Sequence, residues 1–158
     1  MNDRLAPAKH IGRRAYALAE KYVVNVPMRA IIDRGLAPDA LALLETTGRR
    51  TGQARRTPLG NGLVDDTFWA IAERGLQADY VRNLQVEPRV RVKVGGHWRV
   101  GTATVLADDD VRARVRTILA ANPSIARRAD AKLLDTSVAI LGTEPVTVRI
   151  DLDPASRP

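Results

Sequence analysis

The segment Thr46–Pro58 concentrates residue types that bind anions. Its sequence, TTGRRTGQARRTP, interleaves four arginines with glycine and threonine. Guanidinium groups present forked N–H donors that match phosphate and carboxylate oxygens, and Gly48 and Gly52 would let several backbone N–H groups converge on one anion. The segment lies between two predicted strands, so we expect a loop that binds a phosphate-bearing ligand. The alternative is a strand connection whose arginines are simply solvated.

A second segment of interest is Ala70–Gly75, together with the predicted helix that follows it. Its small residues would let a planar ring lie against the backbone at the end of a strand. Arg74 adds a cation for another anionic group, and Tyr80 and Asn83 fall near one face of the helix. Tyr80 with Leu84 would equally form the packing face of that helix. This segment therefore supports a binding site only in combination with the first.

The composition excludes several common kinds of active site. The chain has no cysteine, hence no thiolate nucleophile, disulfide or cysteine-ligated metal. Neither His10 nor His97 has another metal ligand at a recognised spacing, and Asp108–Asp110 is better explained as a helix cap than as a metal site. No G-x-S-x-G or Walker sequence occurs. We predict no metal, and no residue stands out as a catalytic acid, base or nucleophile.

The chain is strongly basic, with a formal net charge of +7. Such a balance favours an anionic partner, which would be a nucleic acid, an acidic membrane surface or a phosphorylated small molecule. An arginine-rich, alanine-rich composition is equally expected from genome base composition. A nucleic-acid-binding module would use the basic residues of one predicted strand pair, namely Arg89, Arg91, Lys93 and Arg99. Aromatic residues make up only 4% of the chain, which argues against stacking on single strands.

Apolar periodicity predicts the elements that must position these segments. Alternation predicts strands over residues 41–47, 55–64, 68–72, 89–94, 98–105 and 146–152. Helical spacing predicts helices over residues 8–24, 25–35, 77–85 and 111–121, with a weaker one up to residue 134. Gly95-Gly96 predicts a tight hairpin turn. The apolar residues of the next strand change face at Gly101, between Trp98 and Ala103, so we expect a bulge there.

Short, hairpin-connected strands without room for helical crossovers indicate an α+β fold with an antiparallel barrel and peripheral helices. We expect a single domain over residues 1–158, flexible at residues 1–8 and 154–158. No apolar run reaches the roughly 20 residues that a membrane span needs, and the N-terminus lacks the apolar stretch of a signal peptide. We therefore expect a cytoplasmic protein, whose first helix either covers a pocket or touches a membrane surface.

In their order along the chain, three stretches resemble the deazaflavin-dependent nitroreductase family. They are TTGRRTGQARRTP from Thr46, AERG from Ala72 and YVRNLQVEPRVRV from Tyr80, within a resemblance that spans about residues 41–105. The resemblance implies a split β-barrel related to flavin reductases, which uses coenzyme F(420), an 8-hydroxy-5-deazaflavin. It also implies hydride transfer from the reduced coenzyme to an electron-poor acceptor, which would be a quinone, a nitro compound or an activated alkene.

The resemblance further implies which residues hold the coenzyme. Four would hold its phosphate and glutamate-bearing tail, namely Arg49, Arg50, Thr51 and Arg55. Two would border the phosphate and the ring, Thr57 and Pro58. Five would contact the ring or line the same groove, Ala72, Glu73, Arg74, Tyr80 and Asn83. Arg74 stands where this family often has lysine, and no His-Pro-x-Trp stretch precedes Tyr80. These departures leave the coenzyme in place and the acceptor open.

The identity of the cofactor and the partners of the protein leave alternatives open. A related barrel that binds FMN instead of the deazaflavin is the nearest alternative. The expected partner is a small-molecule hydride acceptor and not a nucleic acid, with a homodimer and a peripheral membrane contact as further expectations.

Overall fold

The computed structural model describes residues 39, 41–122 and 144–155. The predicted helices over residues 8–24 and 25–35 lie outside these ranges, as does the weaker helix up to residue 134.

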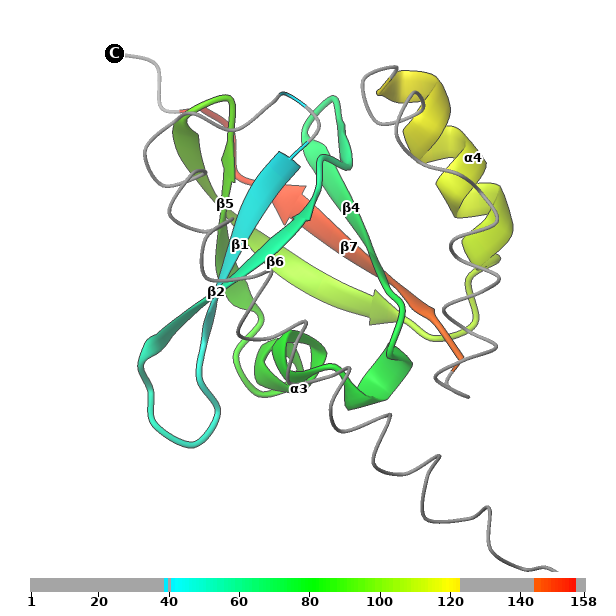
Figure 1. Ribbon diagram of the computed structural model, residues 1–158. Helices are drawn as coiled ribbons and strands as arrows, with labels where there is room; N and C mark the ends of the chain where they lie inside the picture. The colour runs from blue at the N-terminus through cyan, green and yellow to red at the C-terminus, as the bar shows by residue number, and fades with distance from the viewer. Residues whose placement is uncertain (1–38, 40, 123–143, 156–158) are drawn as a thin grey trace, which may run out of the picture.

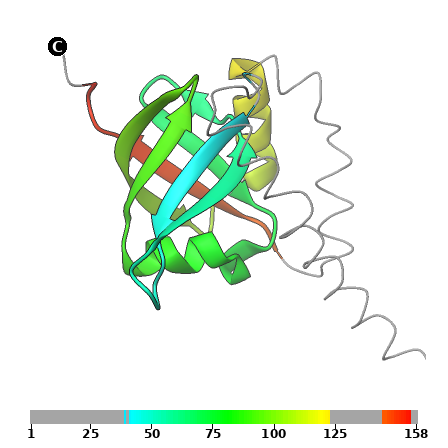
Figure 2. The ribbon, with the colours of Figure 1, turned by 60° about the vertical axis from the view of Figure 1, so that its left-hand side comes forward.

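Seven strands form one antiparallel sheet that curls into a split barrel (Figures 1 and 2). They are β1 (Leu41–Thr47), β2 (Ala54–Gly60), β3 (Leu63–Val64), β4 (Thr67–Ala72), β5 (Arg89–Val94), β6 (His97–Leu106) and β7 (Val146–Leu152). Their order is β2-β1-β5-β6-β7-β4-β3, so the two outermost strands, β2 and β3, do not pair with each other. The predicted fold class is confirmed.

Short helices flank the barrel. A 3-10 turn, η2 (Gly75–Gln77), leads into α3 (Asp79–Val86), and α4 (Val111–Ala121) follows β6. Helix α3 lies at one end of the barrel, beside the loop between β1 and β2 (Figure 2). Helix α4 packs along β3, β4 and β7. The predicted cap of α4 is confirmed, because the carboxylate of Asp110 accepts a hydrogen bond of 3.0 Å from the N–H of Ala113.

The core fills the inner face of the sheet. Alternation puts every second residue of a strand on that face, and Leu44, Phe68, Val148 and Ile150 are fully buried there. Fully burying one such side chain contributes roughly 1.5–3 kcal/mol. The sheet therefore forms a rigid base for the segments at its ends.

The predicted bulge at Gly101 is wrong. Strand β6 pairs in unbroken register with β5 from His97 to Thr102 and with β7 from Gly101 to Leu106. Trp98 lies on the outer face instead, where the guanidinium of Arg91 lies 4.7 Å from its ring centroid. Glycine is required at position 101 because a Cβ there would lie 2.7 Å from the carbonyl oxygen of Asp151.

The strand predicted over residues 55–64 is two strands, β2 and β3. They are separated at Asn61 and Gly62, where the chain turns away from its pairing with β1. The Asn61 side chain accepts a hydrogen bond from the N–H of Leu63 at 3.1 Å and donates one to the carbonyl of Asp39 at 2.8 Å. An asparagine that bonds to nearby backbone in this way favours a turn over a continuous strand.

Candidate functional site

The loop of residues 48–53, which joins β1 to β2, is closed by its own hydrogen bonds. The N–H of Gly48 donates to the carbonyl of Gln53 at 2.7 Å, and the N–H of Gly52 donates to the carbonyl of Gly48 at 2.8 Å. The N–H of Gln53 donates to the hydroxyl of Thr51 at 3.3 Å. The prediction that these backbone N–H groups converge on an anion is therefore wrong, because the loop uses them itself. An anion bound here would therefore be held mainly by side chains.

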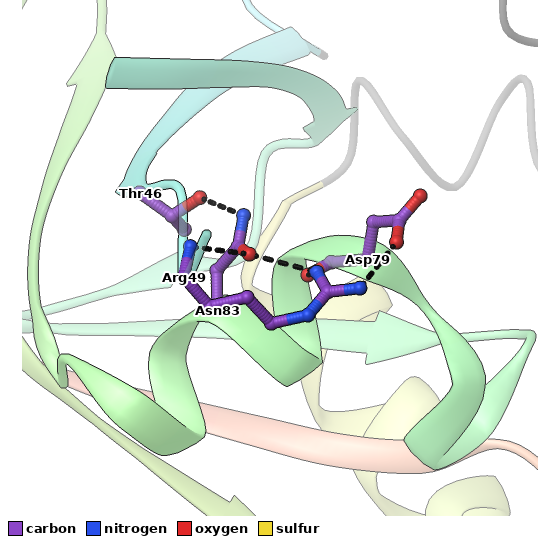
Figure 3. Close-up of polar contacts among 4 residues, drawn as sticks. All are labelled: Thr46, Arg49, Asp79 and Asn83. Carbon is purple, nitrogen blue, oxygen red and sulfur yellow. Dashed lines mark hydrogen bonds and ion pairs between the residues drawn. The ribbon is translucent and has the colours of Figure 1, made fainter. Parts of the chain in front are cut away.

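Four side chains, which we call the Asn83 network, tie this loop to helix α3 (Figure 3): Thr46, Arg49, Asp79 and Asn83. The Oδ1 of Asn83 accepts from the backbone N–H of Arg49 at 3.2 Å and from its guanidinium at 2.9 Å. The Nδ2 of Asn83 donates to the hydroxyl of Thr46 at 3.1 Å. The guanidinium of Arg49 also forms an ion pair of 3.1 Å with Asp79. Arg49 thus points at the helix.

Arg50 and Arg55 are the exposed cations of this loop region. Among the described residues, Arg50 has no ion pair, and Arg55 donates only to the hydroxyl of Thr51, at 3.5 Å. In the register of β1 with β2, Arg55 pairs with Thr46 and therefore shares the face that α3 covers. Both guanidinium groups have no carboxylate partner in the part of the chain that the structure describes.

The other predicted residues of β2 fall on two faces. Thr57 lies two residues beyond Arg55 on the same face of the strand, whereas Pro58 lies on the opposite face. The structure thus brings the four predicted tail residues together at one end of the barrel. Thr57 lies further along β2 on the same face as Arg55, and the side chain of Pro58 is turned away from them.

The second predicted segment begins at the end of β4 and reaches the same end of the barrel. The side chain of Ala72 is buried in the core, so only its backbone can face a ligand. Glu73 and Arg74 follow, and Arg74 is exposed. Tyr80 packs against the core from α3; burial raises the pKa of its phenol, and the nearby charge of Glu73 raises it further. The phenol of Tyr80 therefore stays protonated at physiological pH.

A groove of about 310 Å³ lies beside the loop on the outer face of β1 and β5. The residues that line it are Glu45, Thr46, Thr47, Gly52, Ala54, Arg89, Val90, Arg91 and Val100. None of them is among the predicted coenzyme-binding residues, although Thr46, Thr47, Gly52 and Ala54 belong to the Thr46–Pro58 segment. Its lining comes from four strands, β1, β2, β5 and β6, and from the β1–β2 loop, which only the fold brings together.

The basic face proposed for nucleic-acid binding does not form. Arg99 lies beside Val92 in the register, on the face opposite to that of Arg89 and Arg91. Moreover, carboxylates neutralise three of these cations: Arg89 pairs with Asp153 at 2.7 Å, Arg91 with Glu45 at 2.6 Å, and Arg99 with Asp66 at 2.8 Å. The nucleic-acid interpretation loses its structural basis.

Glu45 should make the stability of the barrel depend on pH. Burial acts to raise the pKa of Glu45, but hydrogen bonds and charge from Arg56 and Arg91 outweigh it, so the pKa lies below its ordinary value of 4.5. A carboxylate with a lowered pKa stabilises the fold above its unfolded-state pKa, and this contribution is lost as pH falls through the folded-state pKa. We expect Glu45→Gln to be less stable than the wild type near pH 7, with the gap narrowing as pH falls below about 4.

Urea unfolding at a series of pH values measures this gap. Asp108→Asn is the matched control, because Asp108 is exposed and makes no ion pair among the described residues. A gap between Glu45→Gln and the wild type that stays constant with pH would contradict the assignment.

The described residues contain no group of three or more metal-ligating side chains. Within those same ranges, no helix is both long and apolar enough to cross a bilayer.

Comparison with known proteins gives the family. No curated protein matches the sequence. Among solved structures, an F420-H2 dependent reductase (FDR-A) is 18% identical, with a TM-score of 0.51 over 70% of this chain and 93% of its own. A domain-swapped dimer is 17% identical, with a TM-score of 0.54 over 77% of this chain and 92% of its own. At this identity they establish the shared fold. The sequence itself matches the F420H(2)-dependent quinone reductases over residues 28–143, and the chain belongs to this family of oxidoreductases.

Proposed function

We propose that this protein transfers a hydride from reduced coenzyme F(420) to a quinone, and that Arg50 and Arg55 hold the anionic tail of the coenzyme. Membership of the family supports the reaction. The observation that carries the site is a pair of exposed guanidinium groups, free of carboxylate partners among the described residues. Arg50 lies on the loop that is fixed to the barrel end, and Arg55 lies at the start of β2.

The donor set around these arginines fits a phosphate and carboxylate tail. Each guanidinium offers several N–H donors, and the hydroxyl of Thr51 lies within reach of Arg55. A hydrogen bond to a charged group contributes roughly 1.5–3 kcal/mol. The predicted role of Arg49 changes in this proposal, because its guanidinium is already bonded to Asp79 and Asn83. We assign Arg49 and Asn83 to holding the loop and Arg50, Thr51 and Arg55 to direct contact.

We assign the ring end of the site to the turn after β4. The backbone at Ala72 ends a strand without a bulky side chain on the ligand's side. Glu73 and Arg74 would border the ring there, with Thr57 on the side of β2 and Tyr80 on the side of α3. Pro58, on the other face of β2, would act only through the backbone that it rigidifies.

When bound, the coenzyme supplies the hydride from its reduced ring. The protein's own task is then to bind, to orient the acceptor and to exclude water. Since burial keeps Tyr80 protonated, this side chain is a neutral hydrogen-bond donor and cannot serve as a base at neutral pH. We propose that solvent supplies the proton that completes the reduction.

A quinone is the first acceptor to test, because the family is described by that activity. Nitro compounds and activated alkenes are the other acceptors of the same electron-poor class. Purified protein should oxidise the reduced coenzyme in the presence of a quinone, followed by the absorbance of the deazaflavin. Parallel titrations with coenzyme F(420) and FMN separate the two cofactors. Tight FMN binding without deazaflavin binding would reject the proposal.

The assembly and the cellular location of the protein are also proposals. One structural relative is described as a dimer, which makes a homodimer the assembly to test by light scattering. The cytoplasmic location remains a prediction from the sequence, and the expected membrane contact of the first helix concerns residues outside the described ranges.

A further inference from the structure

We propose that Asn83 is a positioning residue, whose side chain fixes the loop of residues 48–53 and with it Arg50, beside Arg55 at the start of β2. This inference rests on the proposed function and adds a determinant of coenzyme affinity that does not itself touch the coenzyme.

Both the oxygen and the nitrogen of the Asn83 side-chain amide form hydrogen bonds. It is only 4% exposed, and its partner Thr46 is 2% exposed. Its oxygen accepts two hydrogen bonds from Arg49, and its nitrogen donates to Thr46 (Figure 3). Leaving a buried polar group without its partner costs the free energy of its desolvation. Any movement of the loop away from α3 would incur that cost, so the amide holds the loop in one place.

Arg49 links the loop to the Asn83 amide and so fixes the orientation of the loop. Its backbone N–H binds Asn83, and its guanidinium contacts Asn83 at 2.9 Å, the carboxylate of Asp79 at 3.1 Å and the carbonyl of Asp79 at 3.4 Å. Because both the main chain and the side chain of Arg49 are held, the backbone of the next residue, Arg50, has a fixed position.

The internal hydrogen bonds of the loop fix its shape but not its angle to the helix. In the described part of the chain, the hydrogen bonds between the loop and α3 all end on Asn83 or Asp79. Gly48 and Gly52 flank the turn, and glycine permits wide backbone movement. The Asn83 network therefore orders the loop in advance, so that less conformational entropy is lost when the ligand binds.

Asn83→Ala tests this role with two readouts. In the protein without coenzyme, hydrogen exchange of the loop amides should become about tenfold faster, because local opening no longer breaks the bonds to Asn83. In a fluorescence titration with oxidised coenzyme F(420), the dissociation constant should rise about tenfold. At saturating coenzyme, kcat should stay within about twofold of the wild type, because the variant weakens binding of the ground state and of the transition state equally.

Two variants separate positioning from a general loss of stability. Asn83→Asp keeps an acceptor for Arg49 and lets the hydroxyl of Thr46 donate, so it should restore slow exchange and a dissociation constant within about threefold of the wild type. Gln85→Ala changes an exposed residue of the same helix and should leave both readouts unchanged. Where Asn83→Ala fails to fold, Asp79→Ala removes one exposed anchor and should move both readouts in the same direction, by about threefold.

The outcomes are distinct. Faster loop exchange together with weaker binding supports the inference. Unchanged loop exchange, or faster exchange with unchanged affinity, overturns it while the wild type still binds the coenzyme. A wild type that binds no coenzyme F(420) would instead reject the proposed function, and the positioning role would fall with it.

Discussion

The double variant Arg50→Ala/Arg55→Ala should raise the KM for reduced coenzyme F(420) by on the order of 100-fold or more. Each removed guanidinium deletes at least one hydrogen bond to a charged group, which contributes roughly 1.5–3 kcal/mol, and tenfold corresponds to about 1.4 kcal/mol. The tail is remote from the reacting atoms, so kcat at saturating coenzyme should change little. Steady-state kinetics with a quinone as the acceptor measures both quantities.

The control must remove the same net charge elsewhere. Arg116→Ala/Arg149→Ala does so, because Arg116 is exposed on α4 and the ion pair of Arg149 with Asp151 lies on the surface of β7. Exposed pairs of this kind contribute little to stability. If both double variants change KM equally, Arg50 and Arg55 act only through overall charge and our assignment is wrong.

Gly62→Ala should prevent stable folding, or destabilise the fold by more than about 3 kcal/mol. A Cβ at this position would lie 1.7 Å from the carbonyl oxygen of Trp69 and 2.7 Å from its carbonyl carbon. The same two residues share a hydrogen bond of 2.9 Å between the N–H of Trp69 and the carbonyl of Gly62. Backbone on both sides prevents an easy adjustment, and overpacking of this kind is among the large destabilising mechanisms.

Urea unfolding of Gly62→Ala beside Gly95→Ala isolates the steric effect. Gly95 lies in the β5–β6 turn with φ of +58°, and a Cβ there would meet nothing within 4 Å. Its replacement costs only the left-handed backbone strain of about 1–2 kcal/mol. A loss of stability in Gly62→Ala no greater than that in Gly95→Ala would show that β3 and β4 can separate at this point.

The sequence predicted the elements that local chemistry controls. Strand β7 has the predicted ends, the glycine pair between β5 and β6 forms a hairpin turn with positive φ at both residues, and Asp110 caps α4. In each case the signal lies within a few neighbouring residues, as alternation, a turn dipeptide or a cap. The bulge at Gly101 failed because apolar character alone does not identify the inner face. Trp98 lies outside among cationic side chains.

For the candidate site, too, the sequence predicted the local features and missed the long-range contacts. Local sequence identified the loop between β1 and β2 and its arginines, but not which of them would remain available. The hydrogen bond between Arg49 and Asn83 joins residues 34 positions apart, and that between Asn83 and Thr46 joins residues 37 positions apart. Contacts at such separation arise from the curl of the sheet, which brings α3 against the end of β1. No spacing rule in the sequence identifies Thr46 or Asp79 as members of this network.

A crystal structure of the complex with coenzyme F(420) tests the central claim most directly. We predict the phosphate of the coenzyme within hydrogen-bond distance of the guanidinium groups of Arg50 and Arg55, with Arg49 still bonded to Asn83. A phosphate bound in the outer groove against Arg89 and Arg91, with Arg50 and Arg55 left in solvent, would contradict it.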